Sequence, residues 1–175
     1  MKHKHIIILS IITTMTLNSF GQKIKESTYD KFLKKYRIAT TDVTIDMKFS
    51  SVLTVSIRSV DTSIFIKFSG RGYSVGVVGA QDFAIFLFTN DSTLELKSKG
   101  LQTYERNGGV NGTDIVFYYE YCAKLSDIEK LSNSTTASIR IYSDQHYSDI
   151  EIKPKKSELI NKLCQLFIRE YNKIQ

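Results

Sequence analysis

The chain has 175 residues, of which 42% are hydrophobic, and this composition is ordinary for a globular protein. A chain of this length fits one domain with a core of its own. The formal net charge is +6, but Lys and Arg are scattered along the chain. This pattern indicates a solvated surface with some preference for anionic partners, and it argues against a nucleic-acid site.

Residues 1–21 have the pattern of a signal peptide. Two lysines precede an apolar stretch at residues 6–17, and Ser19-Phe20-Gly21 has the small residues of a cleavage site. The apolar stretch is too short to span a membrane, and no later stretch is long enough. We therefore expect a periplasmic or secreted protein whose mature chain has no transmembrane span; an uncleaved N-terminal anchor is the alternative. Without this segment the net charge falls from +6 to +4, because it holds two Lys and no acid.

Residues 24–37 fit two structures. Large apolar side chains recur at the spacing of one helix face, and Ser27 or Thr28 could cap such a helix. These apolar residues are Tyr29, Phe32, Leu33 and Tyr36. The alternative is an extended arm that continues into residues 38–40, and the sequence leaves this choice open.

Three strands and a glycine-rich segment follow. Apolar and polar residues alternate over residues 43–48, 52–60 and 64–68, which is the pattern of half-buried strands. The glycines of residues 70–76 have neither the spacing of a dinucleotide fingerprint nor the Lys of a phosphate loop. They indicate a turn or bulge before a short strand at residues 73–78, and we expect no cofactor.

Residues 83–97 are the centre of the predicted fold. Residues 83–88 are all apolar, which is typical of a strand covered on both faces. After a polar turn at residues 89–92, Leu94 and Leu96 alternate with polar residues. This pattern predicts an antiparallel hairpin whose first strand needs a cover on each face.

The next segments are a predicted loop and a predicted strand. Residues 98–112 are rich in Gly, Asn and Ser and indicate a loop or hairpin tip. Residues 114–122 predict a strand with Tyr119 and Tyr121 on one face and Tyr118 on the other. Three tyrosines could form a stacking platform for a flat ligand, but we favour ordinary sheet packing.

A short helix and a second hairpin are predicted next. Residues 126–129 read Ser-Asp-Ile-Glu, the sequence of a capping box. The hairpin spans residues 137–152, and its tip holds Asp144 and His146, with Asp149 nearby. A single His at this spacing falls short of a recognisable metal site, so we expect no bound metal.

The last element is a long helix after Pro154. An apolar stripe at helical spacing runs through it, formed by Ile160, Leu163, Cys164, Phe167, Tyr171 and Ile174. We expect this stripe to cover the second face of residues 83–88. Cys164 would then lie against the sheet and could form a disulfide with Cys122 in an exported protein. Two buried free thiols are the alternative.

The motifs of common catalytic sites do not occur. His146 is the single His after residue 21, and neither G-x-S-x-G nor H-E-x-x-H is found in the chain. We therefore name no catalytic residue and expect a binding protein rather than an enzyme. The carboxylate pair of a small hydrolase would show only in three dimensions.

A set of short segments carries a family resemblance. They are Ser19-Phe20-Gly21-Gln22, Tyr29-Asp30-Lys31-Phe32, Ile85-Phe86-Leu87-Phe88, Leu125-Ser126-Asp127-Ile128 and Ser138-Ile139-Arg140-Ile141-Tyr142, followed by the final helix. In this order they resemble small exported proteins of the Bacteroidota that have no assigned function. The likeness covers most of the chain after residue 21. It implies a compact domain of sheet and helices, and it carries over no activity and no site.

The patterns together predict a single α+β domain over residues 22–175. It would consist of a strongly bent antiparallel sheet of about seven or eight strands, with a short helix and a long C-terminal helix packed on it. We expect this domain to bind a protein or a component of the cell envelope. One alternative is a barrel-like carrier of a small apolar ligand, and another is a small carboxylate-based hydrolase.

Overall fold

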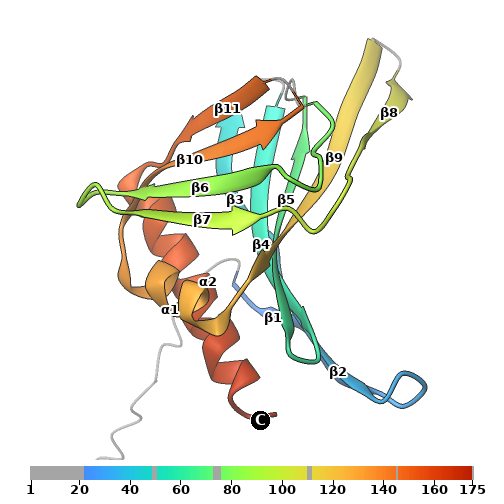
Figure 1. The fold of residues 1–175 in the computed structure, drawn as a ribbon, viewed down its shortest axis with the longest axis vertical. Helices are drawn as coiled ribbons and strands as arrows, with labels where there is room; N and C mark the ends of the chain where they lie inside the picture. Colours follow the sequence, from blue (N-terminus) through green and yellow to red (C-terminus); the bar gives the residue numbers. More distant parts are fainter. Residues whose placement is uncertain (1–21, 49–50, 73–75, 110–111, 145, 175) are drawn as a thin grey trace, which may run out of the picture.

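The computed structural model describes residues 22–48, 51–72, 76–109, 112–144 and 146–174, which form eleven strands and two helices. The predicted signal peptide and residues 110–111 of the predicted tip lie outside the described residues. Figure 1 shows two antiparallel sheets whose strands cross steeply, with both helices below the smaller sheet in this view.

The strands divide into a larger and a smaller sheet. The larger sheet has the order β1-β2-β4-β5-β9-β8, and β3 also pairs with β4. Its strands are β1 (Ile24–Asp30), β2 (Lys35–Thr40), β3 (Val43–Lys48), β4 (Ser51–Val60), β5 (Ser63–Arg71), β8 (Tyr104–Gly109) and β9 (Gly112–Ala123). The smaller sheet has the order β11-β10-β6-β7. Its strands are β6 (Phe83–Phe88), β7 (Thr93–Lys97), β10 (Thr136–Ser143) and β11 (His146–Glu151).

The core lies between the inner faces of the two sheets. Strand alternation places an apolar side chain there at every second position. The buried residues of the sheets include Leu53, Val55, Ile57, Ile64, Ile66, Phe68, Phe117, Tyr119, Tyr121, Ala84, Phe86, Phe88, Leu94, Leu96, Ile139 and Ile141. The rings of Phe68 and Phe86, with centroids 6.0 Å apart, join the two sheets. The two predicted hairpins are therefore confirmed, whereas a bulge in β3 leaves Met47 71% exposed and breaks the alternation predicted for residues 43–48.

The prediction of one strongly bent sheet was wrong, although the α+β class and both helices are confirmed. The chain builds two sheets, and neither closes into a barrel among the described strands. Part of the difference lies in the segment 98–112, which was predicted as a loop or hairpin tip and not counted as a full strand. Its strand β8 has no apolar alternation but pairs with β9 along its length. Backbone pairing with the apolar strand β9 therefore outweighs the weak β-strand propensity of this polar segment.

Residues 24–37 form the extended hairpin β1–β2, which was the open alternative to a helix. The Asp30 carboxylate accepts hydrogen bonds from the backbone N–H groups of Phe32 and Leu33, both at 3.0 Å. Lys34 adopts a left-handed conformation with a φ of 52°. Both features close a turn and stop a helix from continuing.

The C-terminal helix α2 (Pro154–Tyr171) buries the predicted apolar stripe but not against the predicted surface. It contacts β1 to β4 and β10 rather than the outward face of β6. Leu163 and Cys164 pack beside Val55 and Ile57 on the inner face of the larger sheet. The smaller sheet crosses the larger one steeply (Figure 1), so the larger inner face extends past it. Helix α2 covers that extension.

The short helix α1 (Leu125–Asn133) begins slightly earlier than predicted. The Asp127 carboxylate accepts a hydrogen bond from the backbone N–H of Lys124 at 2.8 Å, so Lys124 and not Ser126 is the N-cap. The Asn161 amide of α2 donates hydrogen bonds to the carbonyl oxygens of Leu131 and Ser134. These bonds satisfy carbonyl groups at the end of α1 and fix the two helices together.

Both cysteines are free thiols in the structure. Cys122 is exposed, on the side of β9 opposite the buried Tyr121, whereas Cys164 is buried between α2 and the inner face of β4. The larger sheet lies between the two thiols, so the disulfide considered from the sequence is not formed. Burial raises the pKa of the Cys164 thiol to about 12.

Candidate functional site

The outward face of the smaller sheet is an apolar surface that none of the described elements covers. Strand β6 alternates between fully buried and partly exposed residues along its whole length. Its partly exposed residues are Phe83, Ile85 and Leu87. The prediction of a strand covered on both faces was therefore wrong, because the single apolar helix stripe is used on the larger sheet.

The strand register arranges this surface in three rows of four residues. From β7 to β11 the rows are Thr93-Leu87-Ser138-Glu151, Glu95-Ile85-Arg140-Asp149 and Lys97-Phe83-Tyr142-Tyr147. We call these twelve residues the outer face. Its apolar centre lies on β6, and charged or polar residues lie on the flanking strands. This distribution is that of an interaction surface with an apolar centre and a polar rim.

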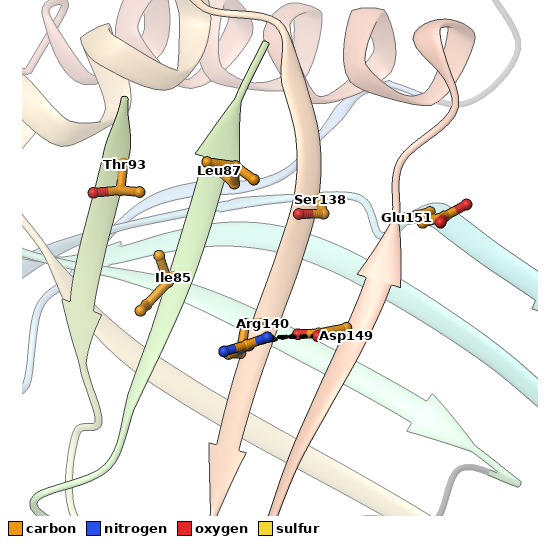
Figure 2. A pocket seen from close by; sticks show the side chains of 7 residues that line it. All are labelled: Ile85, Leu87, Thr93, Ser138, Arg140, Asp149 and Glu151. Atoms are coloured by element: carbon orange, nitrogen blue, oxygen red, sulfur yellow. Dashed lines mark hydrogen bonds and ion pairs between the residues drawn. The ribbon is translucent and has the colours of Figure 1, made fainter. Parts of the chain in front are cut away.

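A groove of about 480 Å³ lies over the first two rows. Figure 2 shows the side chains that line it, all on one side of the sheet. The lining residues are Ile85, Leu87, Thr93, Ser138, Arg140, Asp149 and Glu151. Apolar atoms from β6 form one part of this lining, and hydroxyl, guanidinium and carboxylate groups form the rest. Such a groove suits an amphipathic segment rather than a purely polar ligand.

Arg140 and Asp149 form a bidentate ion pair across the middle row. The Arg140 Nε lies 2.6 Å from one Asp149 carboxylate oxygen, and Nη2 lies 2.6 Å from the other. The hydrogen bonds from Arg140 hold the pKa of the Asp149 carboxyl below its usual range. The pair therefore fixes the plane of the guanidinium group within the groove.

Aromatic rings form the third row beside this ion pair. The Phe83 and Tyr142 ring centroids are 4.5 Å apart, and those of Tyr142 and Tyr147 are 5.9 Å apart. The Arg140 guanidinium carbon lies 4.1 Å from the Tyr147 ring centroid, so the cation also contacts an aromatic face. Rings held in this way can meet a partner without losing much side-chain freedom.

Sequence reasoning considered Asp149 only as a neighbour of a metal site that it then rejected, and it did not place Asp149 on the outer face. Asp144 and His146 are exposed at the hairpin tip, and Asp149 is paired with Arg140. No group of three His, Cys, Asp or Glu residues in the described part of the chain could hold a metal ion. The pairing of residues 140 and 149 was available from the sequence, because it follows from the register of the predicted hairpin.

The three tyrosines of β9 do not form a stacking platform. Tyr119 and Tyr121 are buried, and burial raises the pKa of both phenols. Tyr118 lies on the opposite face, where the Lys67 ammonium group is 4.8 Å from its ring centroid. The favoured interpretation, ordinary sheet packing, agrees with this arrangement.

Among the described residues, the carboxyl groups with clearly altered pKa values are paired with cations. Asp149 is one of them, and hydrogen bonds from Lys173 and Ser27 lower the pKa of Glu170. Burial raises the pKa of Glu120, but hydrogen bonds from Arg58 and Lys99 outweigh it and the net shift is downward. A general acid near neutral pH needs a raised pKa, so these three carboxyls are poorly suited to that role.

In the part of the chain that the structure describes, neither helix is both long and apolar enough to cross a membrane. Comparisons of the chain with family models, with curated proteins and with solved structures found no match.

Proposed function

We propose that this chain is a non-enzymatic binding domain and that its outer face holds a protein partner. The observation that carries this proposal is the partial exposure of Phe83, Ile85 and Leu87 in a central strand of the smaller sheet. The part of each apolar side chain that still faces water adds nothing to the core. A partner that covered them would remove this apolar surface from solvent.

The chemistry of the outer face favours a protein over a small metabolite. Tyr, Phe and Arg, which are enriched in the centres of protein interfaces, occur here together. Arg140 and Asp149 neutralise each other, which leaves Glu95, Glu151 and Lys97 around the apolar centre with a net charge of −1. The best-fitting partner is therefore an extended or flat apolar segment with a cation beside it.

The two alternatives drawn from the sequence receive less support. The space bounded by Phe86, Leu131, Cys164 and neighbouring core residues has a volume of about 10 Å³. This volume is at the limit for one water molecule, so it offers no room for a carried ligand. The hydrolase alternative lacks a paired carboxyl with a raised pKa among the described residues. The signal-peptide pattern of residues 1–21 supports a partner outside the cytoplasm.

The test is a binding measurement with a partner that is first identified by capture from the envelope fraction of the host. The variant Ile85→Ser with Leu87→Ser should weaken the affinity for the purified partner by on the order of tenfold or more, because it removes the apolar centre. The matched control is Met47→Ser with Leu101→Ser, which changes two side chains that are 71% and 74% exposed elsewhere. This control should bind as the unchanged protein does.

Isothermal titration of each variant would decide the matter, with urea unfolding as a check that every variant is folded. Equal affinity of the unchanged protein and the Ile85/Leu87 variant would overturn the proposal. Loss of binding in the Met47/Leu101 control would overturn it as well, because the contact would then not depend on the outer face.

A further inference from the structure

The turn of the hairpin β1–β2 carries an exposed apolar tip. Figure 1 shows this turn, in blue, standing clear of both sheets and both helices. Phe32 is 99% exposed and Leu33 is 54% exposed. An apolar side chain that is almost fully exposed contributes nothing to the core. These two residues are adjacent at the apex of a defined turn, so their exposure needs a separate explanation.

The tip is held in place by contacts along the hairpin. The two Asp30 hydrogen bonds set the turn, and the Tyr29 and Tyr36 rings pack across the strands with centroids 4.9 Å apart. At the base, the backbone N–H of Asp61 donates to the Tyr36 carbonyl at 2.7 Å. The Ser27 hydroxyl donates to the Glu170 carboxylate of α2 at 2.8 Å. The domain therefore presents the tip in one orientation.

Basic side chains surround the apolar tip. Lys31, Lys34 and Lys35 are exposed, and no ion pair involves them among the described residues. The acid of this turn, Asp30, is already occupied by the two backbone N–H groups and by Arg37, whose Nη2 lies 3.2 Å from its carboxylate. The turn therefore combines two exposed apolar side chains with three cations that have no partner within it.

We propose that this tip docks on the surface of an anionic lipid bilayer. Phe32 and Leu33 would enter the boundary between headgroups and acyl chains, while Lys31, Lys34 and Lys35 contact anionic headgroups. Tyr29 and Tyr36, which are 47% and 41% exposed, lie behind the apex and suit the headgroup level. Flexible lysine stems around an apolar apex fit a fluid, negatively charged surface better than a partner with fixed hydrogen-bonding groups. The proposal is independent of the outer face, which is formed by other strands.

The test is sedimentation of the exported protein with vesicles, after its N-terminus has been established by intact mass. Vesicles of phosphatidylglycerol and phosphatidylcholine in equal parts should bind the protein, and vesicles of phosphatidylcholine alone should not. Phe32→Ser with Leu33→Ser should reduce binding by on the order of tenfold. Lys31→Gln with Lys35→Gln should reduce it by about twentyfold at low salt, and added salt should shrink that difference.

The matched control is again Met47→Ser with Leu101→Ser, which removes comparable exposed apolar side chains away from the hairpin. It should sediment with the anionic vesicles as the unchanged protein does, and circular dichroism should show that all variants keep their fold. Equal binding to both kinds of vesicle would overturn the proposal. Absence of binding, unchanged binding of the Phe32/Leu33 variant, or a tip that instead engages an acidic protein would also overturn it.

Discussion

The two faces of the smaller sheet use alternate residues of the same strands but meet different surroundings. On the inner face, Ala84, Phe86 and Phe88 are buried against the larger sheet. On the outer face, the alternate residues of β6 are partly exposed, although they are equally apolar. The same hydrophobic run therefore serves the fold on one side and, in our proposal, a partner on the other. Hydropathy alone cannot separate these two roles.

The outward face of the larger sheet provides a second contrast. There the Glu120 carboxylate accepts hydrogen bonds from Arg58 at 2.6 Å and Lys99 at 2.8 Å. Both cations also lie over the Phe65 ring, 5.3 and 4.9 Å from its centroid. Charged side chains thus lie over the Phe65 ring on this face. On the smaller sheet the apolar side chains of β6 stay partly exposed beside a groove, which is why we place the binding site there.

The largest expected effect separates the two faces of β6. Phe86→Ala should lower the free energy of unfolding by about 3–5 kcal/mol, because it leaves a cavity between the sheets. Ile85→Ala should lower it by less, roughly 1–2 kcal/mol, because part of that side chain is already in water. Urea unfolding of both variants would measure the difference. Equal losses would mean that the outer face is buried in the folded chain.

The two cysteines should show the same contrast between inside and outside. Cys164→Ala should cost about 1–2 kcal/mol of stability, because the thiol fills core space, and Cys122→Ala should cost almost nothing. A thiol reagent should modify one cysteine in the folded protein and both in denaturant. An intact mass two hydrogens lighter before any reduction would contradict the free thiols.

The Glu120 cluster should contribute to stability in a pH-dependent way. Glu120→Gln should lower the free energy of unfolding near neutral pH by about 1 kcal/mol, since Arg58 and Lys99 are partly exposed and screened. The Glu120 pKa is lowered in the folded state, so its contribution is present above the ordinary carboxyl pKa and is lost as the pH falls through the lower value. Urea unfolding of both proteins at several pH values should show that their difference in free energy of unfolding disappears in acid. A stability difference that persists at acidic pH would argue against the ion pairs of Glu120.

A small effect on stability is also expected for the outer-face ion pair. Asp149→Asn should change the free energy of unfolding by less than about 1 kcal/mol, because both partners are exposed. The same change should weaken partner binding, because it frees the Arg140 guanidinium from its fixed orientation. Urea unfolding and titration with the partner would separate the two effects. A large loss of stability with unchanged affinity would assign the pair to the fold instead.

Local patterns predicted local structure well in this chain. Alternation marked β4, β5, β7 and β10, and the stripe that includes Leu163 and Phe167 marked α2. These patterns did not predict which surface an element packs against. Nothing in the spacing of the α2 stripe says whether it packs on β6 or β4, and that choice depends on how the two sheets cross.

The helical spacing of residues 24–37 failed for a different reason. The spacing of Tyr29, Phe32, Leu33 and Tyr36 is helical, but Asp30 and the left-handed Lys34 close a turn between them. Their apolar side chains consequently lie outside the core. The outer face was missed because its members come from four strands, although the register that joins Arg140 to Asp149 could be counted from the hairpin.

The most direct test of the central claim is site-specific photo-crosslinking in the living host. A photoreactive amino acid would replace Ile85 in one protein and Met47 in a matched control. The account predicts one crosslinked protein partner from position 85, suppressed by excess unlabelled domain but not by the Ile85/Leu87 serine variant, and no such product from position 47. Monomer alone at position 85, or the same product at both positions, would contradict the assignment of the outer face as the binding surface.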